Sequence, residues 1–539
     1  MLKANGIEYT KGCNAGFFVW LNLGKNYLEA NPGEKVRSGT ELTDMIMQRY
    51  LHSRNQHREL AGPSLVQPRP HLELLFNHDE ACKCFEQAIA HDGMCAMAYW
   101  GLAYAAGPNY NRSWHLFDPS DLQQSMKRCH DAARRARELV STGQATVTSI
   151  EAALIQAIQS RFPVDHPVEA FSVLDKKYAS AVEKVYHQYG EEDLDVVTLY
   201  ADALMHTALL YQVQRVFDRG LQHEDANCHP GILHLFIHFL ERSATPAAAL
   251  PAAYKLRNLV PDAGHMHHMP THLDVLVGDY RRSIDSNTAA VRADEKYIAR
   301  ESLIYAAILA GQSKVAMKVL NDMEASITDD VLRIKSPPLA DWMEFFKAVR
   351  VHVYIRFGIA HAAMGNIAEA EQERELYHAA AKRVPPTRKD FPNLIVDVLK
   401  IATAMLDAEI QYRRGNFTSA FEYLREAIRH DDSLLYTEPW GLLLPTRHAY
   451  ATLSLEQGHA EEALRAYAED SSLTRAHRYP NNVWALHGYH ECLLKLGREE
   501  ARIIKQQLEV ALAVADIEIR SSCCCRLAVS GTKSAACCR

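Results

Sequence analysis

The sequence has no run of eighteen or more apolar residues, so no membrane-spanning helix is expected. Residues 1–5 have neither an apolar core nor a cleavage site, which argues against secretion. A formal net charge of −7 leaves no basic excess for nucleic acid. Five of the twelve cysteines lie in the last seventeen residues and the others are scattered, as is typical of a reduced intracellular protein. We therefore expect a cytoplasmic protein without a nucleic-acid partner.

Common catalytic motifs and strand patterns are also missing. The chain has no HExxH, no Gly-rich phosphate loop and no G-x-S-x-G. Sustained alternation of β-branched residues is nearly absent, whereas apolar residues spaced by three or four recur through most of the chain. The composition, 48% hydrophobic and 23% charged, is that of an ordinary globular protein. These features predict an all-α fold.

Four histidines repeat at a fixed interval. His268 and His272 follow His234 and His238 by 34 residues each. This period is typical of the tetratricopeptide repeat, a helix–turn–helix unit that stacks on copies of itself. Within each pair the spacing is i,i+4, which places both rings on one face of a helix. We therefore predict four imidazoles gathered on two adjacent repeats.

Glycines extend the repeat pattern beyond the histidines. A five-residue step from a turn glycine to a small residue of the next helix occurs at Gly311–Ala316, Gly365–Ala370, Gly415–Ala420 and Gly458–Ala463. Upstream, residues 193–213 are predicted to form one helix. The whole predicts a tetratricopeptide-like α-solenoid, a right-handed superhelix of helix pairs. The expected organisation is an irregular segment 1–70, repeats over 71–220, a His-rich central pair at 221–295, repeats over 296–520 and a disordered Cys-rich tail at 521–539.

The chain resembles a group of large tetratricopeptide-repeat proteins of bacteria and filamentous fungi. The likeness rests on residues 76–101, 229–241, 264–294 and 481–492, and is most specific in the central HPGILHLFIHFLE and GHMHHMPTHL. It implies the repeat fold and the histidine pattern but no reaction. In two places the resemblance implies a longer segment than this chain has. These are an insertion between Thr207 and His229 and a helix between Ala299 and Ile308.

The repeated histidines are candidate metal ligands, because neutral imidazole commonly binds zinc, iron and copper. The resemblance implies that they face the concave groove, together with a carboxylate one turn further on. The first set of candidate ligands is His234, His238, His268, His272 and Glu241. A second set, for metal or groove, is His265, His487, Glu491 and His78. A single i,i+4 pair arises often by chance, and only its repetition at the same period favours a site. His78 also suits a purely structural role at a turn.

Two classes of function remain open. The first is a metal-dependent enzyme, either an oxygen-activating oxidoreductase or a hydrolase, that acts on a small organic substrate with iron, copper or zinc. The second is a scaffold that binds a protein or peptide partner without catalysis. Scaffolds of this repeat class usually present Lys, Arg and Asn to their ligands. Histidine and glutamate at the groove positions favour a cation instead.

Overall fold

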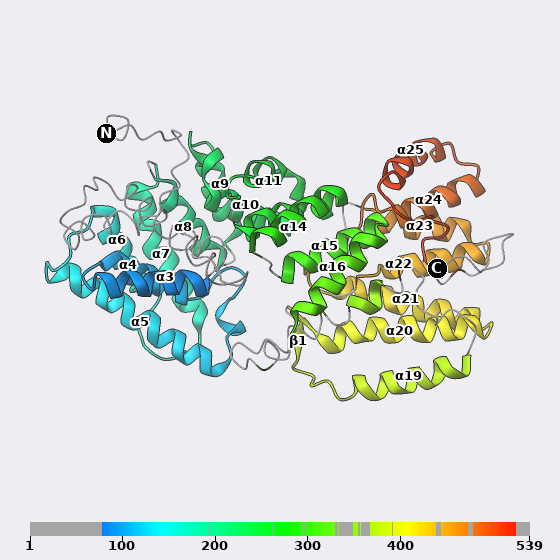
Figure 1. Ribbon diagram of the computed structural model, residues 1–539, viewed down its shortest axis with the longest axis horizontal. Helices are drawn as coiled ribbons and strands as arrows, with labels where there is room; N and C mark the ends of the chain where they lie inside the picture. Colours follow the sequence, from blue (N-terminus) through cyan, green and yellow to red (C-terminus); the bar gives the residue numbers. More distant parts are fainter. Residues whose placement is uncertain are drawn as a thin grey trace, which may run out of the picture. The chain divides into compact units, whose positions relative to one another are not determined.

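The computed structural model is built almost entirely of helices (Figure 1). By contacts the chain divides into two compact units, Met1–Phe239 with Ala252–Val260, and Leu240–Pro251 with Pro261–Arg539. The division falls within the predicted central segment, 221–295, and the predicted irregular segment 1–70 lies outside the described residues. The structure describes residues 78–191, 193–207, 209–261, 263–294, 297–328, 333, 346, 349–353, 356, 367–390, 392–437, 443–472, 478–523 and 526.

The first unit contains helices whose starts are set by capping side chains. The Asp118 carboxylate accepts the N–H groups of Ser120 and Asp121, and Thr148 and Glu151 form a capping box. The α-helices are α3 (His78–His91), α4 (Ala96–Ala106), α5 (Pro119–Ser141), α6 (Ser149–Ile158), α7 (Phe171–Tyr189), α8 (Leu194–Met205) and α9 (Leu210–Gly220). Short 3₁₀ turns are η3 (Trp114–Leu116) and η4 (Ala226–Cys228). Helices α10 (Pro230–Glu241) and α11 (Leu250–Leu256) run across the division between the units.

The second unit is a succession of helices that pack against their neighbours in the chain. It begins with the 3₁₀ turn η5 (Pro246–Ala249), α12 (Gly264–His268), α13 (Pro270–Val277), α14 (Tyr280–Asp294), α15 (Tyr297–Ala310) and α16 (Ser313–Ser326). It continues with α19 (Ile367–Ala381), α20 (Ile395–Arg413), α21 (Phe417–Ser433), α22 (Thr446–Glu456), α23 (Ala460–Asp470), α24 (Val483–Lys495) and α25 (Ala501–Leu512). Between α19 and α20, β1 (Lys389–Asp390) and β2 (Asn393–Leu394) form a minimal antiparallel pair, with Lys389 opposite Leu394 and Asp390 opposite Asn393.

The glycine-to-alanine steps mark turns between packed helices. Gly311, Gly415 and Gly458 have φ angles of +72°, +81° and +86°, a left-handed conformation that favours glycine. The alanines five residues later, Ala316, Ala420 and Ala463, are fully buried. Three of the predicted steps are therefore confirmed, and Gly365 lies outside the described residues. The fold is all-α and repeat-like, as the sequence predicted.

One local expectation was wrong. The single helix predicted over 193–213 is broken into α8 and α9, which pack against each other across a turn. Of the tail at 521–539 the structure describes residues 521–523 and 526, where Ser522 is buried and bonds to Thr452 and Tyr467, while Arg526 pairs with Glu491. Among the described residues no helix is long and apolar enough to span a bilayer.

Candidate metal centre

Helix α10 carries the first histidine pair. The helix begins at Pro230. Proline has no backbone N–H, which is no loss in the first turn, where N–H groups have no acceptor within the helix. The Ile232 N–H donates to His229 Nδ1 at 3.1 Å, and His229 Nε2 donates to Asp195 Oδ1 at 3.0 Å. His229 thus caps the helix. Beyond it, the rings of His234 and His238 lie 4.8 Å apart, as the i,i+4 spacing predicted.

The second histidine pair spans a short interruption between α12 and α13. Pro270 cannot donate a backbone hydrogen bond, so the segment is divided there, although Met269 N–H still bonds to His265 O at 2.9 Å. The rings of His268 and His272 nevertheless remain 4.8 Å apart, at an interplanar angle of 76°. The predicted helical spacing of this pair is confirmed despite the proline.

A chain of four side chains within the second unit fixes this pair. His272 Nδ1 lies 2.6 Å from Glu241 Oε2, and its Nε2 lies 3.0 Å from His268 Nε2. At the other end, His268 Nδ1 lies 2.8 Å from Asn287 Oδ1 on α14. The amide orientation of Asn287 follows from its Nδ2, which donates to Ser283 Oγ at 3.4 Å. The second helix of the repeat therefore orients a histidine of the first.

These partners assign the tautomers of both rings. A carboxylate and an amide oxygen only accept, so Nδ1–H of His272 donates to Glu241 and Nδ1–H of His268 donates to Asn287. Each neutral ring then has its lone pair on Nε2, and the two Nε2 atoms face each other at 3.0 Å. Two lone pairs at that distance are held together either by a proton between them or by a cation that both bind.

The donor set suits a transition-metal ion. Two nitrogens bound at about 2.0–2.1 Å to one zinc ion are roughly 3 Å apart, close to the separation of the Nε2 atoms. A ligating histidine typically donates its other N–H to a carboxylate or carbonyl, as both rings do here. Of the first candidates, Glu241, His268 and His272 lie together in the second unit. His234 and His238 lie on the part of α10 that belongs to the first unit.

Burial of the first candidates differs from the expected exposure on a groove. His234, His238, His268, His272 and Glu241 have exposed fractions of only 0–7%, whereas His265 is half-buried. Repeat register predicts which face of a helix a residue takes, but not how closely the neighbouring helices cover that face. The buried setting strengthens electrostatic interactions and raises the cost of an uncompensated charge.

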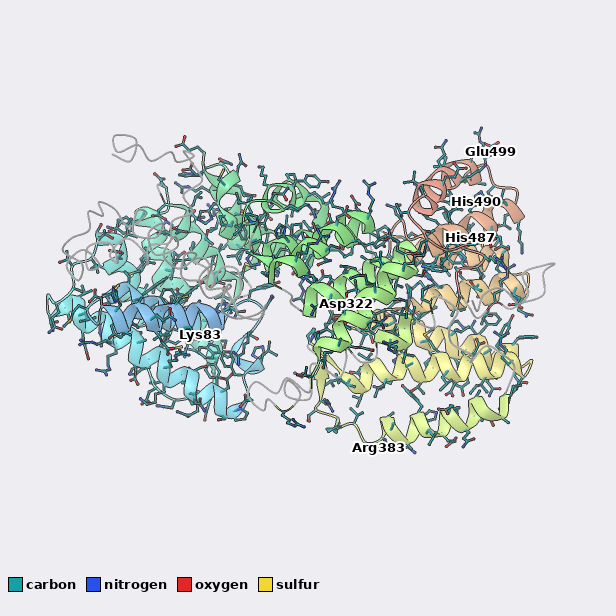
Figure 2. All side chains as sticks on the ribbon, viewed as in Figure 1. Lys83, Asp322, Arg383, His487, His490 and Glu499 are labelled. Atoms are coloured by element: carbon teal, nitrogen blue, oxygen red, sulfur yellow. The ribbon has the colours of Figure 1, made fainter. Side chains whose placement is uncertain are left out.

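The other second-tier residues lie elsewhere. His487, labelled in Figure 2, is a half-buried residue of α24, and burial lowers its pKa. Glu491 accepts two hydrogen bonds from Arg526, at 2.7 and 3.0 Å, so its carboxylate has an internal cationic partner. His78 Nδ1 bonds to Ala105 O at 3.1 Å, which ties α3 to the end of α4 and agrees with a structural role. Among the described residues, none of the three is part of a cluster that could hold a metal ion.

Sequence reasoning missed two polar features of the second unit. Asn287 orients His268 from a helix that contains no metal-binding motif. Only its place in the repeat, nineteen residues after His268, could have suggested this role. The second feature is His448, a buried residue on α22. Its Nε2 donates to Asp470 Oδ2 at 2.9 Å, and Arg356 Nη2 donates to its Nδ1 at 3.2 Å. Burial, assisted by the Arg356 charge, lowers the pKa of His448 despite the opposing effect of Asp470.

Acidification should destabilise the second unit through His448. Because its pKa is lower in the folded than in the unfolded chain, the unfolded state binds the extra proton as pH falls below about 6.5. Stability is then lost, by at most about 1.4 kcal/mol per pH unit from this group. Urea unfolding at pH 7.5 and 5.5 checks this: wild type should lose more stability than His448→Gln. An equal or larger loss in the variant would contradict it.

Comparisons with known proteins add little to this geometry. No family model matches the chain, and no curated protein matches it. Among solved structures, it aligns with a circular tandem repeat protein described as having a novel repeat topology and enhanced subunit contact surfaces. That alignment covers 81% of this chain and 88% of the other at 12% identity, with a TM-score of 0.18. A superposition this poor carries no argument about function, and the chain is placed by its own structure as an all-α, repeat-like protein.

Proposed function

We propose that this protein binds a divalent transition metal ion through the histidines of α12 and α13. The observation that carries the proposal is the pair of Nε2 atoms of His268 and His272, 3.0 Å apart, with each Nδ1 engaged by an outer partner. Glu241, the partner of His272 Nδ1, brings a carboxylate to the same place within the second unit. Nitrogen and carboxylate donors together suit zinc, iron or copper.

Glu241 has two possible roles that the same geometry accommodates. As an orienting group it accepts the His272 Nδ1–H and keeps Nε2 available, which is the arrangement found here. As a ligand it would offer a carboxylate oxygen beside His272 within the same unit. We assign it the orienting role, because its 2.6 Å contact with His272 Nδ1 occupies one carboxylate oxygen.

The proposal extends to metal-dependent catalysis on a small organic substrate. A metal ion bound here would supply Lewis acidity or, for iron or copper, redox chemistry. The chain's own part is to orient the imidazoles through Glu241 and Asn287 and to keep bulk water away by burying the ligands. A low-dielectric setting of this kind strengthens the field of a bound cation on a substrate. The scaffold function has no comparable support.

Elemental analysis by plasma mass spectrometry tests the proposal, on protein purified without tags or chelators. We expect about one metal ion per wild-type chain, near-complete loss in the double variant His268→Ala, His272→Ala, and retention in His267→Ala. His267 is a suitable control because it lies on α12 but bonds to Pro261 O at 2.9 Å. Zinc would favour hydrolysis, whereas iron or copper would favour oxidation. Wild type without metal after reconstitution would overturn the proposal and favour the scaffold.

A further inference from the structure

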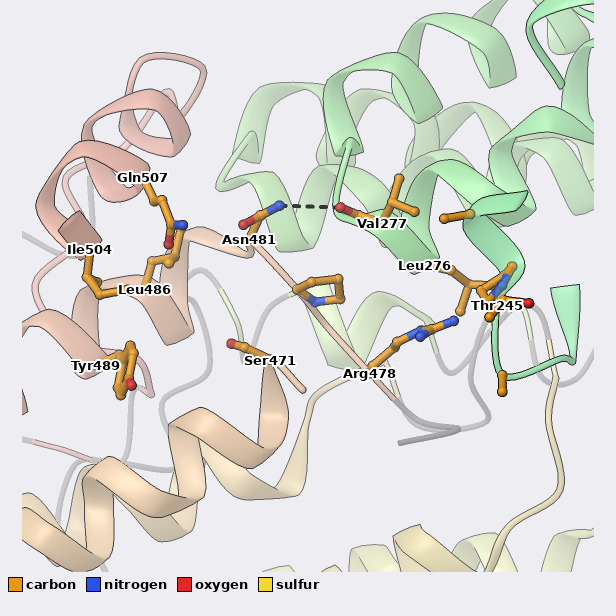
Figure 3. A pocket seen from close by; sticks show the side chains of 14 residues that line it. Thr245, Leu276, Val277, Ser471, Arg478, Asn481, Leu486, Tyr489, Ile504 and Gln507 are labelled. Atoms are coloured by element: carbon orange, nitrogen blue, oxygen red, sulfur yellow. Dashed lines mark hydrogen bonds between the residues drawn. The ribbon is translucent and has the colours of Figure 1, made fainter. Parts of the chain in front are cut away.

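A cavity of about 480 Å³ lies within the second unit, among α13, α24, α25 and the segment after α10 (Figure 3). Its volume is in the range of small-molecule binding sites. Apolar side chains from three helices form most of the wall, including Leu276, Leu486 and Ile504. The view in Figure 3 shows Leu486, Ile504 and Tyr489 on one side, and Arg478 close to Leu276 and Thr245 on the other.

Two walls of this cavity continue directly from the candidate metal centre. Leu276 and Val277 follow His272 by four and five residues on α13, which is about 6 Å along the helix. Residues 244–247 follow Glu241 by three to six residues at the end of α10. The cavity therefore lies at the carboxyl ends of the two helices that bring His272 and Glu241 together.

One charged side chain stands among the described lining residues. Arg478 is 6% exposed, and its guanidinium remains protonated at all physiological pH values. Arginine binds carboxylates through planar, charge-assisted hydrogen bonds. The lining also includes uncharged polar side chains, namely Thr245, Ser471, Asn481, Tyr489 and Gln507. The cavity is thus complementary to a molecule with one anionic group and an apolar body.

Hydrogen bonds and a close backbone approach within the protein hold the wall between Val277 and Asn481. Asn481 Nδ2 donates to Val277 O at 3.3 Å, and Tyr280 OH donates to Pro480 O at 2.8 Å. Gly278, at φ +79°, leaves no room for a side chain, since a Cβ there would collide with the Pro480 carbonyl. This close approach fixes the α13–α14 turn against the segment before α24. A preformed wall lowers the entropic cost of binding.

We propose that this cavity binds a small monocarboxylate with an apolar body, and that it is the substrate pocket of the candidate metal centre. The binding of a monocarboxylate is inferred from the cavity and Arg478. The role as substrate pocket rests on the proposed function. The carboxylate pairs with Arg478, and the apolar body packs against Leu276, Leu486 and Ile504. That orientation places the substrate beside the turn of α13 that follows His272.

Calorimetry with 4-phenylbutyrate as the probe tests the binding, on the full chain. We expect measurable affinity in wild type, at least about tenfold weaker binding of the uncharged 4-phenylbutyramide, and a similar loss for 4-phenylbutyrate in Arg478→Gln. Leu276→Trp, which fills the cavity, should abolish binding. Arg498→Gln is the matched control, because Arg498 pairs with Glu461 on the surface. Equal binding of acid and amide to wild type, which needs no variant to fold, would overturn the proposal.

A second measurement separates this inference from the proposed function. Metal content should be the same in Arg478→Gln as in wild type, and 4-phenylbutyrate should bind after chelator treatment as well. In cobalt-loaded protein the NMR signals of the bound probe should broaden, whereas zinc-loaded protein should leave them sharp. Binding without any metal uptake would overturn the proposed function and the substrate role. Metal uptake without carboxylate binding would overturn the pocket alone.

Discussion

Replacing His272 with alanine is expected to abolish the gain in thermal stability that a bound metal ion gives the wild-type protein. His272 lies at the centre of the site, since its two nitrogens contact Glu241 and His268. A metal ion that binds only the folded state stabilises it by about 2.7 kcal/mol when present at one hundred times its Kd. Chelation should therefore lower the melting temperature of wild type and leave that of His272→Ala unchanged.

Two further variants sharpen this experiment. His267→Ala should keep the wild-type response to chelation, because His267 contacts Pro261 outside the site. Glu241→Gln keeps an oxygen that can accept the His272 Nδ1–H, so an orienting role predicts an intermediate loss of metal affinity, about 10–100-fold. Complete loss in Glu241→Gln would make Glu241 a ligand instead. A chelator response in His272→Ala equal to that of wild type would exclude His272 from the site.

Substitution of Trp484 by alanine is expected to cost about 3–5 kcal/mol of unfolding free energy in the second unit. The indole is 5% exposed, and its Nε1 donates to Ile308 O at 2.7 Å, which joins α24 to α15 across 176 residues of sequence. The Arg356 guanidinium lies 4.9 Å from the ring and adds a cation–π contact. The substitution removes packing, a hydrogen bond and this contact together.

A conservative replacement separates these contributions. Trp484→Phe keeps most of the apolar contact but leaves the Ile308 carbonyl without its indole donor, so about 1–3 kcal/mol should be lost. Urea unfolding followed by a probe in the second unit measures both variants. A loss below about 1 kcal/mol in Trp484→Ala would show that α24 and α15 are held together by other contacts.

The helix pairs were predictable because their signals are local. A glycine at positive φ followed by a buried small residue five positions on reflects steric limits within one turn, as at Gly415 and Ala420. The i,i+4 spacing of His234 and His238 likewise follows from helical periodicity alone. The break between α8 and α9 was missed, because apolar spacing continues through it.

The partners of the histidines were less predictable. Glu241 was foreseen as a donor from its position one turn after His238, yet its contact with His272 depends on how the chain folds between Glu241 and α13. Asn287 and Arg478 were not foreseen at all, since an amide on α14 and an arginine before α24 carry no motif. Such residues take their roles from neighbours distant in sequence. Pattern reading within one helix does not reach them.

The sequence by itself determined the all-α class, the turn glycines and the pairing of histidines on helical faces, because each depends on backbone geometry over a few residues. Only the tertiary structure decided that the histidines are buried, that Glu241 and Asn287 orient His272 and His268, and that a cavity opens one turn beyond them. Those properties depend on which helices meet and at what distance. Side-chain packing between repeats sets that distance, and no local pattern encodes it.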